Sequence, residues 1–174
     1  MFKIKSLPAE RGKGDMAWDE KGHSEISQIF ISLDRDYFSC IQFQYFENGS
    51  LVLSPPYGAY DGHGPTLYTV QFNYPSEFLT RVSGKYTYDH LRSITFTTNK
   101  GTYGPYGGNN ARHGLELFEF NFNMGENKQF GGFHGLYHSR ALRSIGVYIN
   151  PSATTQTSPG EISESKADVV KLWT

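Results

Sequence analysis

The sequence lacks cysteine pairs, a strong net charge and long apolar segments. It has 1 cysteine among 174 residues and a formal net charge of −1. A single thiol cannot close an internal disulfide, so the cysteine content gives no indication of an oxidising compartment. We expect Cys40 to be buried and inert, because a free thiol packs as a small hydrophobic group. The near-neutral charge argues against nucleic acid as a partner, since such surfaces need clustered Lys and Arg.

Apolar residues account for only 37% of the chain. Residues 1–14 alternate charged side chains with single apolar ones, so we recognise no secretory leader there. No segment is long and apolar enough to suggest a membrane span. We therefore expect a cytoplasmic or nuclear protein that has no membrane partner.

Aromatic residues and glycine, in contrast, are abundant. The chain is 16% aromatic and contains 19 Gly, which favours pleated sheets joined by tight turns. Phe118, Phe120 and Phe122 alternate with polar residues, which is the period of a strand with one buried face. Similar short segments recur between Gly-, Asn- and Pro-rich turns. This pattern predicts an all-β domain of about eleven or twelve strands, with no helix before residue 150.

One unit is repeated three times. The segments 38–43, 91–96 and 142–147 align on Ile41, Ile94 and Ile145, which are 53 and 51 residues apart. Twelve residues before each isoleucine is another apolar residue, and these are Ile29, Val82 and Phe133. Such a repeat indicates one supersecondary unit used three times, with approximate threefold symmetry. The first residues of the three segments, Phe38, Leu91 and Leu142, should therefore occupy equivalent inner positions.

The composition also suggests where the domain lies. We expect a flexible lead-in over residues 1–13, one domain over residues 14–150 and a disordered polar tail over residues 151–174. Thr, Ser, Gln, Gly and Glu dominate the tail as far as Lys166, and such a segment buries too little apolar surface to offset its ordering entropy.

Several motifs resemble those of the jacalin-related lectins, in particular the mannose-type, cytoplasmic branch. The motifs are WDEKG at residues 18–22, TTNKGTYGPYG at 97–107, FGGFHG at 130–135 and IGVY at 145–148. Their order and spacing match from about residue 12 to residue 150. The resemblance implies the β-prism I fold, in which three four-stranded Greek-key sheets are related by pseudo-threefold symmetry. It also implies a non-enzymatic carbohydrate-binding module, and the chain looks closest to plant jacalin-type virus-resistance proteins.

The resemblance also implies where a sugar would bind. The family uses a Gly-Gly pair ahead of the tryptophan and a GxxxD loop ahead of IGVY. In this sequence the first element falls on Gly14 and Asp15, and the second on residues 139–143. The residues that carry the second element are Ser139, Arg140, Ala141 and Arg143. Arg143 stands where the family has the aspartate. A guanidinium has five hydrogen-bond donors but, unlike a carboxylate, it cannot accept hydrogen bonds from sugar hydroxyl groups.

Four interpretations stay open at this site. In the first, the chain is a mannose-type lectin. In the second, it is a lectin of altered specificity in which Arg140 and Arg143 bind an anionic group and Tyr88 stacks on a sugar face. In the third, it is a jacalin-fold interaction protein of antiviral defence with a degenerate sugar site. In the fourth, the two arginines are solvated loop charges. Protein partners and a homo-oligomer also stay open.

Neither a catalytic site nor a cofactor or metal site is expected. His134 and His138 would lie about 13 Å apart on an extended chain, too far to share one ion. Asp34, Asp36 and Asp89 have the right residue type for glycoside hydrolysis. They fall in expected hairpin turns, however, where Asp is common for conformational reasons.

Overall fold

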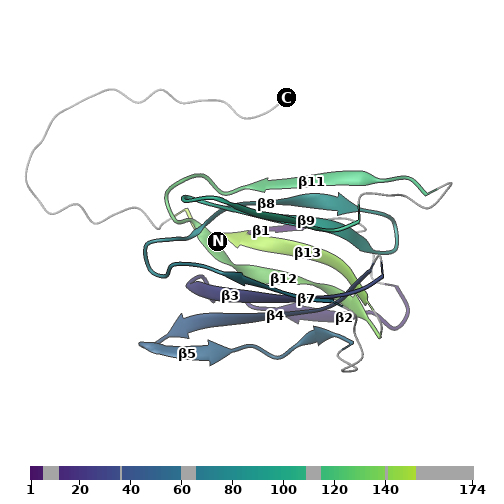
Figure 1. The fold of residues 1–174 in the computed structure, drawn as a ribbon, viewed down its shortest axis with the longest axis horizontal. Coiled ribbons are helices and arrows are strands. Elements are labelled where there is room, and N and C mark those ends of the chain that lie inside the picture. Colours follow the sequence, from purple (N-terminus) through teal and green to yellow (C-terminus); the bar gives the residue numbers. More distant parts are fainter. Residues whose placement is uncertain (6–11, 36, 60–65, 109–114, 140, 152–174) are drawn as a thin grey trace, which may run out of the picture.

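The computed structural model describes residues 1–5, 12–35, 37–59, 66–108, 115–139 and 141–151, and these form strands without a helix (Figure 1). Apart from Pro151, the tail that we predict over residues 151–174 lies outside the described residues. None of the described segments is a helix long and apolar enough to cross a membrane.

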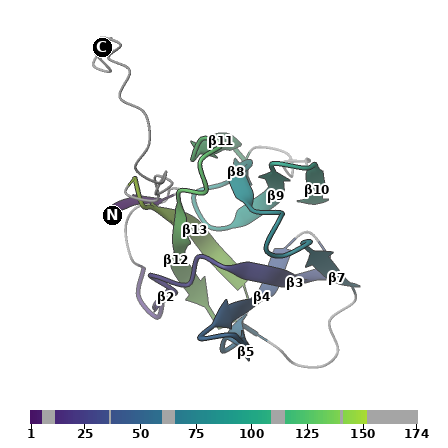
Figure 2. The ribbon, with the colours of Figure 1, turned by 90° about the vertical axis from the view of Figure 1, so that its left-hand side faces the viewer.

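The strands form three antiparallel sheets around a common interior (Figure 2). The first sheet contains β3 (Ile26–Asp34), β4 (Tyr37–Glu47), β5 (Ser50–Leu53), β6 (Tyr57–Gly58) and β7 (Thr66–Gln71). The second contains β8 (Leu79–Tyr86), β9 (Leu91–Thr98), β10 (Thr102–Gly107) and β11 (Phe118–Asn123). The third contains β1 (Phe2–Lys5), β2 (Met16–Asp19), β12 (Phe130–His138) and β13 (Ala141–Ile149). This architecture confirms the predicted three-sheet β-prism.

Each sheet is built on one copy of the repeat. The repeated segments form the central hairpins β3–β4, β8–β9 and β12–β13, and one or more further strands flank each hairpin on either side. The third sheet takes its flanking strands from the other end of the chain, since β1 pairs with β13 and β2 pairs with β12. The prism is thereby closed by strands that are more than 100 residues apart in sequence.

The first residues of the lead-in that we predict over residues 1–13 form a strand. Residues 2–5 form β1, in which Phe2 pairs with Ile149 and Ile4 with Val147. The reason is that β12 pairs with only one edge of β13, and β1 takes the other edge. Residues 6–11 lie outside the described residues.

The repeat places its apolar residues in one core. Phe38, Leu91 and Leu142 are each 0% exposed, which confirms the equivalent inner positions. Cys40 is buried as predicted, and burial raises the pKa of its thiol to about 11.

Two of the three sheets contain a glycine that makes room for an aromatic ring. A Cβ on Gly135 would lie 2.7 Å from the Trp18 ring, and one on Gly84 would lie 2.8 Å from the Phe120 ring. Each pair faces across neighbouring strands, β12 to β2 and β8 to β11. The first sheet has Ile31 at the equivalent place, and its partner Tyr68 is partly exposed. The glycines therefore allow the aromatic rings to close the core over the sheet.

Candidate functional site

The two sequence elements of the predicted sugar site meet at one end of the prism. The turn that begins at Gly12 leads into β2, and β2 pairs with β12, whose last residues form the hairpin to β13. Met16 faces Tyr137 across these strands, so the Gly12–Asp15 turn adjoins the β12–β13 hairpin. The structure thus brings Gly14 and Asp15 next to the hairpin residues, as the family resemblance implies.

An ion pair joins the two elements. The Nε atom of Arg143 lies 3.5 Å from Oδ2 of Asp15, and the side chains are 19% and 0% exposed, respectively. The same Oδ2 accepts a hydrogen bond of 2.7 Å from the backbone N–H of Gly12. The carboxylate of this site therefore comes from the N-terminal turn instead of the hairpin, and it is committed to neighbours inside the protein.

The hairpin residues pack closely against the turn. A Cβ on Gly14 would lie 3.4 Å from Nε2 of His138, and the positive φ of 90° at Gly14 also favours glycine. The Ser139 hydroxyl lies 3.2 Å from Nδ1 of His138. Ala141 is buried at the first position of β13. Arg140, the remaining predicted residue of this hairpin, lies outside the described residues.

Tyr88 is not placed against this hairpin. It is 66% exposed and meets the Phe118 ring edge-on at 5.1 Å between ring centroids. Within the described part of the chain, no hydrogen bond, ion pair or ring contact joins it to Ser139 or Arg143. Its predicted role in stacking on a sugar at the Ser139–Arg143 loop has no support from its position.

Sequence reasoning missed three residues at this end. Arg92 is almost fully buried, and its Cζ lies 5.4 Å from the centre of the Tyr37 ring. That ring also meets His90 at 4.9 Å. Burial lowers the pKa of His90, and the positive charges of Arg143 and Arg92 lower it further. One sequence signal could have pointed to Arg92. The sequence Leu-Arg-Ser-Ile occurs at both 91–94 and 142–145, so Arg92 is the repeat equivalent of Arg143.

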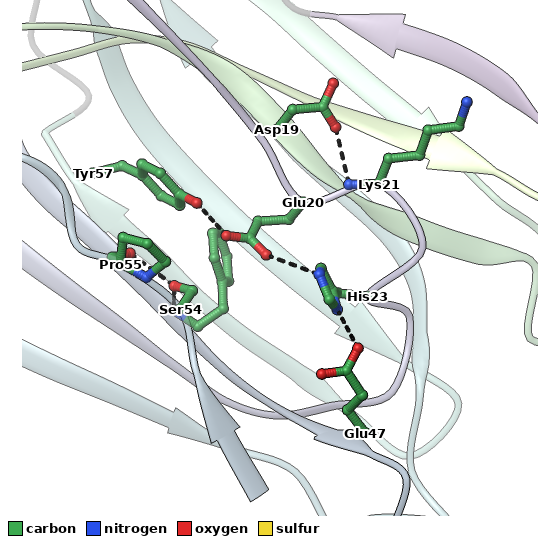
Figure 3. Close-up of polar contacts among 9 residues, drawn as sticks. Asp19, Glu20, Lys21, His23, Glu47, Ser54, Pro55 and Tyr57 are labelled. Carbon is green, nitrogen blue, oxygen red and sulfur yellow. Dashed lines mark hydrogen bonds and ion pairs between the residues drawn. The ribbon is translucent and has the colours of Figure 1, made fainter.

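At the other end of β2, a buried carboxylate fixes the segment that follows Trp18 (Figure 3). Glu20 accepts a hydrogen bond from the Tyr57 hydroxyl, and its second oxygen lies 3.6 Å from His23 Nε2. His23 also lies 4.0 Å from Glu47. The Trp18 ring stacks on Tyr57 at 4.8 Å. These contacts give the acid a structural role, since both of its oxygens are engaged.

The comparisons with known proteins agree with this geometry. The sequence profile of the jacalin-like lectin domain matches residues 9–148, and the chain belongs to this family. Protein RESTRICTED TEV MOVEMENT 1 of Arabidopsis thaliana is 40% identical over 158 residues, covering 86% of this chain and 87% of that protein. Jacalin-related lectin 2 of the same plant is 34% identical and covers 91% of each chain.

Solved structures show the same fold. The mannose-binding lectin from Champedak has a TM-score of 0.66 at 30% identity, covering 84% of this chain and 96% of the lectin. A mannose-specific jacalin-related lectin from Morus nigra, in complex with mannose, has a TM-score of 0.64 at 27% identity and covers 85% of this chain and 94% of that one. The predicted family and the predicted β-prism are both confirmed.

Proposed function

We propose that this protein is a carbohydrate-binding module of the jacalin type that acts by binding alone, without a chemical step. Its sugar site is the place where the Gly12–Asp15 turn meets the β12–β13 hairpin. Family membership supports this proposal, as does the likeness to lectins described as mannose-binding. Mannose-type glycans are therefore the first ligands to test.

One observation carries the proposal. The two elements that the family uses for a sugar are adjacent in this chain, with Arg143 3.5 Å from Asp15 and His138 next to Gly14. A glycine at position 14 lets the backbone approach a ligand closely. The adjacency of the two elements supports a sugar site here, although their side chains differ from the family pattern.

The changed side chains alter how a glycan would be held. In the family pattern a hairpin carboxylate accepts hydrogen bonds from two sugar hydroxyl groups, whereas Arg143 can only donate hydrogen bonds. Asp15 cannot replace that carboxylate in the structure as it stands, because its side chain is buried and bonded to Gly12. We propose that the ligand's hydroxyl oxygens act as acceptors toward Arg143 and Ser139, which defines an altered mannose-type geometry.

The proposal is tested by comparing the native chain with Asp15→Gly/Ser139→Gly/Arg143→Asp, which rebuilds the family pattern. Calorimetric titration with methyl α-mannoside and a glycan array should show binding by the native chain, with a different sugar preference from the rebuilt one. Arg81→Asp is the control for the Arg143→Asp substitution in this variant, because it reverses one charge in the same way at an exposed position of β8. Absence of native binding to every sugar on a dense array would contradict a lectin function.

The non-catalytic part of the proposal has its own test. The native chain should release no chromophore from nitrophenyl glycosides above the background of heat-denatured protein. Turnover that disappears when one acid, such as Glu20 or Asp89, is replaced by its amide would show that the protein is an enzyme.

A second candidate function is protein interaction in plant antiviral defence, with a degenerate sugar site. The internal Asp15–Arg143 ion pair favours it, because the pair satisfies charges that a lectin would direct at its ligand. The 40% identity to protein RESTRICTED TEV MOVEMENT 1, a virus-restriction protein, also favours it. In this case only the rebuilt variant should bind methyl mannoside. Equal binding by the native and rebuilt chains would exclude a degenerate site.

A further inference from the structure

The outer face of the second sheet is hollowed at its centre. The cavity has a volume of about 390 Å³, within the range of about 300 to 1,000 Å³ typical of small-molecule sites. Most of its lining side chains are small or polar. Those used below are Ser83, Lys85, Ser93, Thr95, Glu119 and Asn121. We refer to this cavity as the outer hollow.

The threefold repeat explains why the second sheet is hollowed here. At the centre of the outer hollow, Ser83 faces Thr95 across β8 and β9. The equivalent pairs are Phe30 with Gln42 in the first sheet and His134 with Gly146 in the third. The His134 ring covers Gly146 so closely that a Cβ there would lie 2.3 Å from it. Two small hydroxyl residues in the second sheet leave the corresponding space open.

Ser93 lines this space, and its hydroxyl is open to it. The residue is 3% exposed as a whole, but its hydroxyl is not one of the fully buried, unpartnered side-chain atoms of the described residues. The equivalent Ser144 of the third sheet accepts a hydrogen bond of 3.2 Å from the N–H of Leu136, whereas no such bond is found for the Ser93 side chain among the described residues. The Ser93 hydroxyl can therefore exchange a hydrogen bond with a ligand hydroxyl in the outer hollow.

The rim supplies one charge of each sign. Lys85 Nζ lies 3.6 Å from Glu119 Oε1, with Lys85 35% and Glu119 77% exposed. A carboxylate accepts hydrogen bonds from ligand hydroxyl groups, and an ammonium group donates hydrogen bonds to hydroxyl oxygens. Together the two side chains have no net charge. Such a rim suits a neutral ligand that has both donors and acceptors better than it suits an anion or a cation.

We propose that the outer hollow is a second binding site, separate from the loop-end site, for a neutral saccharide. Ser83, Ser93, Thr95 and Asn121 form its floor, and Lys85 and Glu119 bind hydroxyls at its rim. The proposal does not depend on sugar binding near Arg143. In the third sheet the His134 ring occupies the equivalent space, and in the first sheet the equivalent position carries the larger Phe30. The site is therefore a property of the second sheet.

The experiment follows amide resonances of the full chain by ¹H–¹⁵N NMR during titration with methyl α-mannoside and methyl α-glucoside. Saturable shifts should appear at Ser83, Ser93, Thr95 and Asn121, independently of any shifts at Gly14 and Ser139. They should persist when Arg143 is replaced. The proposal would be overturned if neither methyl glycoside shifted any amide resonance of the outer hollow. It would also be overturned if sodium glucuronate or sulfate bound there more tightly than the neutral glycosides.

Two variants sharpen the test. Ser93→Ala should weaken binding at the outer hollow at least about tenfold. It should not lower stability, because the hydroxyl it removes faces the hollow and makes no hydrogen bond to another described side chain. Ser144→Ala is its matched control, which should lower stability and leave the binding unchanged. Ser83→Phe/Thr95→Gln copies the side-chain pair of the first sheet and should abolish the shifts by filling the space. Undiminished binding by both Ser93→Ala and the filled variant would overturn the proposal.

Discussion

Asp15 and Arg143 form an ion pair across two loops, with Arg143 Nε 3.5 Å from Asp15 Oδ2. In the family pattern, residue 15 would be glycine and residue 143 aspartate. Compared with the family pattern, the carboxylate is therefore on the N-terminal turn, as Asp15, and the hairpin carries the cationic Arg143 where an aspartate is expected. The two changes compensate each other electrostatically, because each buried charge keeps a partner of the opposite sign.

Arg143→Met should lower the free energy of unfolding by about 3 kcal/mol, because it removes a counter-charge from the buried Asp15 carboxylate. Asp15→Asn/Arg143→Met should cost clearly less than the sum of the two single changes. Urea unfolding of the four proteins gives the coupling energy, which should be between about 0.5 and 3 kcal/mol. Strict additivity would show that the contact has no energetic role.

Motif spacing predicts that Gly14, Asp15, Ser139 and Arg143 lie together. The structure places them close to one another, with Arg143 3.5 Å from Asp15 and Gly14 next to His138, the neighbour of Ser139. That they bind a sugar stays a prediction. Tyr88 was assigned by loop equivalence alone, which does not specify the direction of a side chain. The contact of Tyr37 with His90 joins two different repeats, and local pattern carries no information on such contacts.

Gly135→Ala should destabilise the protein by about 1 to 3 kcal/mol, the usual cost of overpacking. The added methyl group would lie 2.7 Å from the Trp18 ring and 2.3 Å from the Ser144 carbonyl oxygen. Gly101→Ala is the matched control, because nothing lies within 4 Å of its Cβ position. That control should remain within about 0.5 kcal/mol of the native chain in urea unfolding. Equal effects of the two changes would contradict the close packing of Trp18 on Gly135.

Truncation of Phe38, Leu91 or Leu142 to Ala should each cost about 2 to 5 kcal/mol, as expected for core cavities. All three are 0% exposed. Leu51→Ala serves as the control, because Leu51 is 54% exposed and its loss should cost less than about 0.5 kcal/mol. Thermal unfolding of the four variants measures these effects. If each of the three core variants lost less stability than Leu51→Ala, the repeat alignment would be wrong.

The repeat made the fold predictable, since Ile41, Ile94 and Ile145 hold one register in three sheets. The pairing of β1 with β13 was not predictable in the same way. β1 has only 4 residues, and its partner lies more than 100 residues away. Short edge strands are placed by the open edge they complete, which becomes visible only when the sheets are assembled.

Two histidines, the half-buried His90 and the buried His134, should make stability depend on pH. Burial lowers the pKa of His90, and Arg143, Arg92 and His138 lower it further, whereas Asp89 raises it. Burial likewise lowers the pKa of His134. Its Nε2 lies 2.8 Å from the Ile4 carbonyl oxygen, and this contact opposes the shift without reversing it.

The sign of the effect follows from proton linkage. Each folded-state pKa is below the ordinary value of 6.5, so the unfolded chain binds more protons once the pH falls through that value. The free energy of unfolding should therefore fall as the pH is lowered from 6.5 toward the folded-state pKa values, and level off with respect to these groups below them. Urea unfolding at several pH values should give a shallower slope for His90→Gln and for His134→Gln than for the native chain. A slope unchanged in both variants would mean that neither histidine is held neutral by the fold.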